Sequence, residues 1–207
     1  MKLYVLATGS SGNASIVQGK HENIALDFGL SYSKWHTLLE KNKLDLPHEY
    51  FITHEHGDHL NQSGLNRLFG KYKGLYFHTN RGTFETQDFT VQAFLVPHDI
   101  ENHGFMVIEK ETNEKLVYIT DASSMYQTAK SYKELLSNAD IYALEANYDE
   151  QYIENPDILD QMNYKYNVFS GMMRHTSKQE SLKTFAMLKK SSSKFVPLHQ
   201  SSRFYNY

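Results

Sequence analysis

Thr53-His54-Glu55-His56-Gly57-Asp58-His59 is the stretch of sequence that decides the fold. It holds three imidazoles and one carboxylate within six residues, at positions suited to metal ligands. The apolar run at 49–53 before it predicts a short strand, and the run at 60–72 after it predicts a helix with leucines on one face. A polar cluster where a strand ends and a helix begins predicts a functional site at the edge of a sheet.

The spacing of the cluster suits metal binding. On an extended segment His54 and His56 point the same way, because side chains repeat every two residues, so they can bind one cation. Asp58 and His59 follow on a turn and can bind a second cation. These donors favour zinc, with manganese or iron as alternatives. Packing is the competing explanation for a single histidine, but three beside a carboxylate favour metal binding.

Composition narrows the class of protein. The 207 residues are enough for one domain with a hydrophobic core, and we expect a single domain over 1–207. No apolar run reaches the roughly eighteen residues needed to cross a membrane, and Met1–Leu6 is interpreted as a strand, not a signal peptide. The absence of cysteine excludes disulfides and thiolate ligands, and is typical of a cytoplasmic protein. The net charge of −3 provides no broad basic field, so contact with nucleic acid must be local.

Other polar residues lie at the ends of predicted strands or before a predicted helix. They are Asp27 after strand 23–28, His98 after strand 89–96, Asp121 after strand 115–120, Glu145 in strand 140–146, His175 before helix 178–190, and His199 after strand 194–198. Three of them have alternatives. Asp27 either orients a histidine or caps a turn. Asp121 either contributes to the site or caps the helix that follows. For Glu145, a histidine-orienting role and a turn cap are equally supported. His103 is the alternative to His98 as the histidine that this part of the chain contributes to the site. We favour His98 because it directly follows its strand.

The central cluster resembles the HxHxDH signature of the metallo-β-lactamase superfamily. Gly9-Ser10-Ser11-Gly12-Asn13 and the element at 144–149 resemble its YycJ/WalJ exonuclease branch, and the segment 199–204 is similar to the end of RNase Z-like nucleases. Arg174 departs from the pattern, since that branch has glycine before the matching histidine. The resemblance implies an α/β fold (α+β in some schemes), an αββα sandwich of two mixed β-sheets flanked by helices.

The resemblance also implies a site for two divalent metal ions. The first ion is expected at His54, His56 and His98, and the second at Asp58, His59 and His199, with Asp121 bridging them. Asp58 and His175 are the expected catalytic residues, with His175 as a general acid. Four more residues are expected to orient ligands or contact substrate: Asp27, Glu145, Ser202 and Arg203.

This site predicts a metal-dependent hydrolase in which a hydroxide bridging the metals attacks a phosphorus atom. Nucleic acid is the expected substrate, in the manner of a DNA exonuclease. The alternatives are a small-molecule hydrolase of a thioester, lactone or cyclic phosphodiester, and a non-catalytic binding protein, which the seven intact ligands disfavour. The segment 151–168 is expected to be a long loop with a helical turn that covers the site. The sequence leaves the oligomeric state open.

Overall fold

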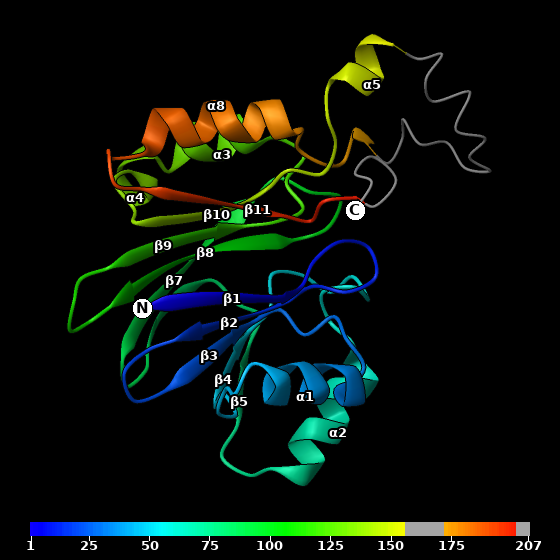
Figure 1. The fold of residues 1–207 in the computed structure, drawn as a ribbon, viewed down its shortest axis with the longest axis vertical. Helices are drawn as coiled ribbons and strands as arrows, with labels where there is room; N and C mark the ends of the chain where they lie inside the picture. The colour runs from blue at the N-terminus through cyan, green and yellow to red at the C-terminus, as the bar shows by residue number, and fades with distance from the viewer. Residues whose placement is uncertain (156–171, 202–207) are drawn as a thin grey trace.

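The computed structural model describes residues 1–155 and 172–201. Two mixed β-sheets lie at its centre (Figure 1). The first sheet has the order β1-β2-β3-β4-β5, with strands β1 (Lys2–Ala7), β2 (Ala14–Gln18), β3 (Asn23–Leu26), β4 (Glu49–Phe51) and β5 (Tyr76–His78). The second has the order β11-β10-β9-β8-β7-β6, with strands β6 (Gly82–Glu85), β7 (Phe89–Val96), β8 (Asn102–Glu109), β9 (Lys115–Ile119), β10 (Ile141–Glu145) and β11 (Lys194–Leu198).

The strand directions bring several strand ends to one edge. In the first sheet β3, β4 and β5 are parallel. In the second sheet β9, β10 and β11 are parallel, and β7 runs in the same direction because two antiparallel pairings, with β8 between them, connect it to β9. The segments that leave these parallel strands at their carboxyl ends can therefore meet at one place.

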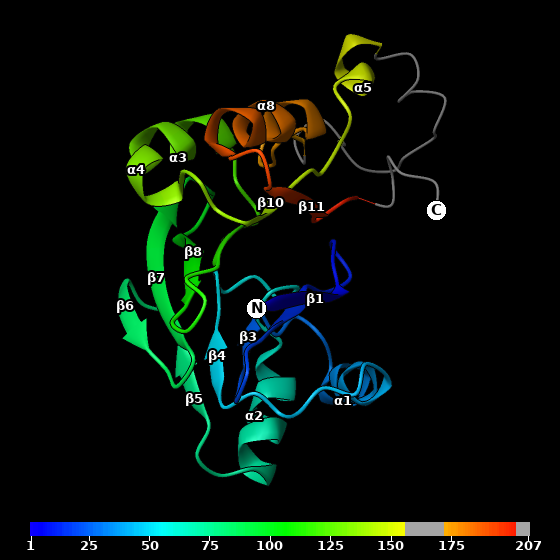
Figure 2. The same ribbon diagram turned by 60° about the vertical axis from the view of Figure 1, so that its left-hand side comes forward.

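Helices cover the outer face of each sheet (Figures 1 and 2). The first sheet is covered by α1 (Tyr32–Lys41) and α2 (Gln62–Lys71). The second sheet is covered by α3 (Met125–Ser131), α4 (Lys133–Leu136) and α8 (Lys178–Leu188), while the short α5 (Gln151–Glu154) lies beyond them. This arrangement confirms the expected αββα sandwich. No helix in the described ranges has the length and apolar character needed to cross a bilayer.

Three hydrophobic clusters hold these layers together. The cluster between the first sheet and its helices includes Trp35 and Tyr50, both fully buried. The cluster between the sheets joins Phe51 of β4 to Phe105 of β8, with ring centroids 5.8 Å apart. The third lies under the helices of the second sheet. Each buried aromatic or aliphatic side chain contributes roughly 1.5–3 kcal/mol, so the sheets are held together mainly by apolar contact.

Several sequence predictions differ from the structure. Strand β6 and helix α3 were not expected, because their sequences are polar and weakly periodic. Ser131-Tyr132-Lys133-Glu134 has the sequence pattern of a capping box, but α4 begins after Tyr132, which makes no side-chain cap. Leu182 is apolar and lies in the helix expected at 178–190, yet its side chain is 40% exposed. The segment 151–168 was expected to contain a helical turn, and its first residues do form the short helix α5, while residues 156–168 lie outside the described part.

The start of α8 connects two helices. Ser177 caps it as predicted, accepting a hydrogen bond from the Glu180 backbone N–H at 2.9 Å. The Glu180 carboxylate contacts the start of α3, where it accepts from the Tyr126 N–H at 2.9 Å and the Ser124 hydroxyl at 3.2 Å. A carboxylate at a helix N-terminus is stabilising, so this contact fixes α8 against α3.

Candidate metal centre

The signature segment leaves β4 and ends in a compact turn between His56 and Leu60, where Asp58 and His59 were expected to follow on a turn. The backbone N–H groups of His59 and Leu60 both donate to the His56 carbonyl at 2.8 Å. The first two histidines, which precede the turn, lie together, with His54 Nε2 3.0 Å from His56 Nδ1. The turn then places the His59 ring beside that of His54, with centroids 4.2 Å apart.

A first group of candidate ligands consists of His54, His56, His98 and Asp121, whose ligand atoms all lie within 4.8 Å of one another. His98 Nε2 is 3.4 Å from His56 Nδ1, and the Asp121 carboxylate is 3.7 Å from His54 Nε2. Nitrogen ligands about 2.0–2.1 Å from a tetrahedral zinc ion would be about 3.3 Å apart, so the spacing fits one cation. Burial, and then the nearby His59, lowers the pKa of His54 to about 2, which keeps its imidazole neutral as a metal ligand must be.

A second group shares Asp121 with the first. Its members are Asp58, His59, Asp121 and His199. Asp121 Oδ1 is 3.3 Å from the Nε2 atoms of both His59 and His199, while Asp121 Oδ2 faces the first group. Burial lowers the pKa of His199, but Asp121, Asp58 and Glu145 together raise it to about 10. The same negative field would attract a divalent cation.

Three residues of the centre have left-handed backbone conformations. They are Asp27, Asp121 and His199, with φ angles of 62°, 51° and 48°. Each follows a strand, β3, β9 or β11, by one or two residues. Such a conformation costs on the order of 1–3 kcal/mol and persists where the surrounding structure fixes it, often at a functional site.

Asp27 holds a histidine of the second group in place. Its carboxylate is fully buried, with Oδ2 2.9 Å from His59 Nδ1. The other oxygen accepts hydrogen bonds from the Thr53 backbone N–H and hydroxyl. Donation from Nδ1 leaves a lone pair on Nε2 of His59, which faces the Asn13 side-chain amide at 2.8 Å and could bind a metal in its place. Of the two roles open for Asp27, the geometry supports orientation of a histidine.

Glu145 performs both of the roles that the sequence left open. Its Oε1 lies 2.6 Å from His175 Nδ1 and 3.4 Å from His199 Nδ1. Its Oε2 accepts from the backbone N–H groups of Ala122 and Thr176 at 2.7 and 3.1 Å. The carboxylate thus orients two histidines and caps two backbone donors. The His175 ring stacks on the His199 ring with centroids 5.0 Å apart, so His175 lies directly beside the second group.

Gly29 permits a close approach between the signature turn and the loop after β3. A Cβ atom at this position would lie 1.7 Å from the Asp58 carbonyl oxygen. The same oxygen accepts from the Asn13 backbone N–H at 2.7 Å, and the Gly29 N–H donates to the Asn13 carbonyl at 2.8 Å. Asn13, in the Gly-Ser turn, therefore fixes the signature turn, a role that its position in the sequence did not indicate.

Asp99 and Arg174 also belong to the surroundings of the first group. Asp99 Oδ1 lies 3.1 Å from His98 Nε2 and 3.5 Å from His56 Nε2, and its Oδ2 accepts from Arg174 at 2.9 Å. One sequence signal for Asp99 is its place directly after His98. The competitor His103 is buried on β8 outside both groups. Ser202 and Arg203 lie outside the described residues.

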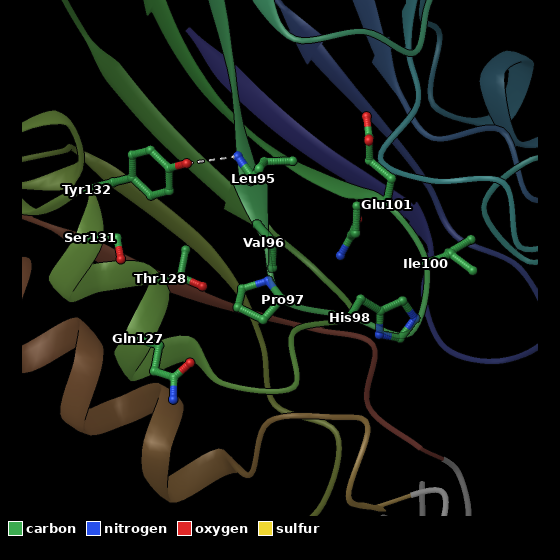
Figure 3. Close-up of a pocket in the computed structure, with 11 residues that line it drawn as sticks. Leu95, Val96, Pro97, His98, Ile100, Glu101, Gln127, Thr128, Ser131 and Tyr132 are labelled. Carbon is green, nitrogen blue, oxygen red and sulfur yellow. Dashed lines mark hydrogen bonds between the residues drawn. The ribbon is translucent and has the colours of Figure 1, made fainter.

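A cavity of about 340 Å³ adjoins the first group, between the end of β7 and helix α3 (Figure 3). His98 forms part of its wall, and apolar side chains from the β7 end and the following loop form another part. Tyr132 closes one side, where its hydroxyl accepts from the Leu95 N–H at 3.3 Å. His98 Nδ1 has no hydrogen-bond partner among the described residues. The cavity is therefore next to a candidate metal ligand.

Comparison with known proteins places this centre in context. No family model matches the chain. Exodeoxyribonuclease WalJ of Streptococcus pneumoniae is 28% identical over 179 residues, which cover 74% of this chain and 65% of that protein. The chain thus spans less than two thirds of the length of this relative.

Solved structures share the fold at lower identity. The short form of human tRNase Z is 21% identical, with a TM-score of 0.67 over 98% of this chain and 93% of that one. The metallo-β-lactamase fold protein YhfI from Bacillus subtilis is 15% identical, with a TM-score of 0.66 over 96% of this chain and 86% of that one. The chain therefore has the fold of these metallo-β-lactamase fold proteins, and its sequence is similar to that of exodeoxyribonuclease WalJ over most of its length.

Proposed function

We propose that this chain is a metal-dependent phosphodiesterase that acts on nucleic acid, with DNA exonuclease activity as the first candidate. The observation that carries the proposal is the convergence of two ligand groups on the two oxygens of Asp121, with His175 beside them. The names of two similar proteins, an exodeoxyribonuclease and a tRNase Z, support a nucleic-acid substrate.

The residues present fit two divalent cations, and imidazole with carboxylate favours zinc. His54, His56 and His98 would hold one ion, Asp58, His59 and His199 the other, and Asp121 both. When bound, the ions would lower the pKa of a water molecule and offset negative charge on the scissile phosphate. By holding Nδ1 of His59, Asp27 would keep the Nε2 atom of that ring directed toward the second ion.

His175 is the proposed general acid. Glu145 accepts a hydrogen bond from its Nδ1, so the proton to be donated resides on Nε2. The buried carboxylate holds the ring so that Nε2, at the far side of the imidazole, can give its proton to the leaving oxygen. At 16% exposure, the side chain is accessible to substrate while its orientation stays fixed.

A second candidate function is the hydrolysis of a small thioester, lactone or cyclic phosphodiester. The cavity beside His98 favours it, because its volume of about 340 Å³ is within the range of pockets for small molecules. The walls from Leu95, Val96 and Pro97 would suit an apolar group.

One experiment separates these candidates. The zinc-loaded protein is incubated with 5′-labelled duplex DNA, single-stranded DNA and RNA, and in parallel with bis-p-nitrophenyl phosphate and a thioester. Metal analysis should give about two ions per chain. Cleavage of a nucleic acid is the expected result, and loss of a labelled 5′-nucleotide would identify an exonuclease. Hydrolysis of the thioester alone would refute the nuclease proposal.

A further inference from the structure

Arg174 is connected to the first ligand group through the carboxylate of Asp99. Its Nη1 donates to Asp99 Oδ2 at 2.9 Å, and Asp99 Oδ1 is 3.1 Å from His98 Nε2 and 3.5 Å from His56 Nε2. Among the described residues, no other arginine or lysine forms an ion pair with Asp99 or with a member of the ligand groups. The guanidinium is therefore positioned at the border of the proposed metal centre.

We propose that Arg174 binds a phosphate of the substrate beside the metal centre, and that Asp99 holds the guanidinium there until the phosphate arrives. This inference rests on the proposed phosphodiesterase function.

The guanidinium is free to make this contact. The Arg174 side chain is 54% exposed, and only Nη1 is engaged by Asp99. Arginine carries five N–H donors in a planar fork that matches two oxygens of a phosphate. An ion pair this exposed contributes little to stability. Breaking the pair with Asp99 therefore costs little free energy, and two hydrogen bonds from the guanidinium to a phosphate would exceed this cost.

The charges around the site create a need for such a cation. The acidic residues that contact the ligand histidines are Asp27, Asp58, Asp99, Asp121 and Glu145. A phosphate that approaches them is repelled unless positive charge is supplied. Apart from the metals, Arg174 is the permanent positive charge that the described residues place in contact with this group.

A structural tether is the competing role. The pair joins the loop after β7 to the segment before α8, and Asp99→Asn separates the two explanations. A tether would be weakened by Asp99→Asn as much as by Arg174→Met. A phosphate-binding arginine would be released by Asp99→Asn, so phosphate affinity would be unchanged or higher.

The test uses zinc-loaded full chain and titration calorimetry with thymidine 5′-monophosphate and inorganic phosphate. The variants are Arg174→Met, Arg174→Lys and Asp99→Asn, with Arg81→Met as the matched control, because Arg81 forms a comparably exposed pair with Glu101 outside the ligand groups. We expect Arg174→Met to weaken nucleotide binding at least tenfold with metal content and melting temperature unchanged. Lysine should restore part of the affinity, and the salt dependence of oligonucleotide binding should fall by about one unit of slope.

The outcomes divide cleanly. Equal affinities for Arg174→Met and Arg81→Met would overturn the inference and leave the proposed function standing. Loss of metal from Arg174→Met, or equal weakening by Asp99→Asn, would assign Arg174 a structural role and also overturn it. A wild-type protein that binds neither phosphate nor nucleotide and cleaves only a thioester would refute the proposed function itself.

Discussion

Replacement of Glu145 by glutamine tests the proposed centre most directly, because the side chain keeps its shape and loses its charge. Glu145 is fully buried, and its two oxygens receive His175 Nδ1 and two backbone N–H groups. Glutamine offers one acceptor oxygen and one NH2 group, so at least one of these donors would face another donor. The His175 ring would also lose the charged acceptor that orients it.

The size of the effect follows from these contacts. A hydrogen bond to a charged group contributes about 1.5–3 kcal/mol. If this energy is lost in the transition state, turnover falls about 10–100-fold, which is also the usual effect of removing a carboxylate that orients an active-site histidine. We expect Glu145→Gln to reduce kcat by this factor.

Asp88→Asn is the matched control. Asp88 is also a buried carboxylate, and it belongs to neither ligand group. It accepts from the backbone N–H groups of His21 and Glu22 and contacts the His21 ring. Both variants should lose stability in urea unfolding, but only Glu145→Gln should lose kcat. Wild-type kcat in Glu145→Gln, or an equal loss in both variants, would refute the orienting role.

Three further outcomes are expected. His175→Ala should slow turnover by about 10²–10⁴-fold with metal content intact; an unchanged rate would remove His175 from the mechanism. Gly29→Ala should reduce metal content and melting temperature, because its Cβ would meet the Asp58 carbonyl, whereas Gly57→Ala, where a Cβ meets nothing within 4 Å, should change neither. Burial raises the pKa of the Asp88 carboxyl, but hydrogen bonds from His21 and Glu22 outweigh burial, so the pKa lies below the usual value of an aspartate. Its stabilising effect should therefore be complete well above pH 4, and the difference in unfolding free energy between wild type and Asp88→Asn should vanish as the pH falls through the folded-state pKa; a difference that persists at lower pH would contradict this assignment.

The sequence predicted the features that depend on local pattern. The strands that end at Asp27, His98, Asp121 and His199 are apolar runs followed by a polar residue, and the structure brings the ends of these strands together. That these residues bind metal stays a prediction. The expected αββα arrangement is confirmed by the two sheets and their outer helices.

Features that depend on distant contacts could not be predicted in this way. Helix α3 is stabilised at its start by Glu180, 54 residues away from Tyr126, and its own sequence is polar. Asp99 and Arg174 are 75 residues apart, so neither carries a local signal for their pairing. The turn between His56 and Leu60 is held by distant loops, since the Asp58 carbonyl accepts from the Asn13 backbone N–H and the His59 carbonyl accepts from the Phe28 N–H.

The two ligand groups draw on both halves of the sandwich. His54, His56, Asp58 and His59 follow β4 of the first sheet, while the remaining ligands follow strands of the second. Neither half alone carries a complete set, so cation affinity reports how firmly the halves are docked. By thermodynamic linkage, if docking of the two halves strengthens cation binding, the bound cations stabilise the docked arrangement by the same free energy.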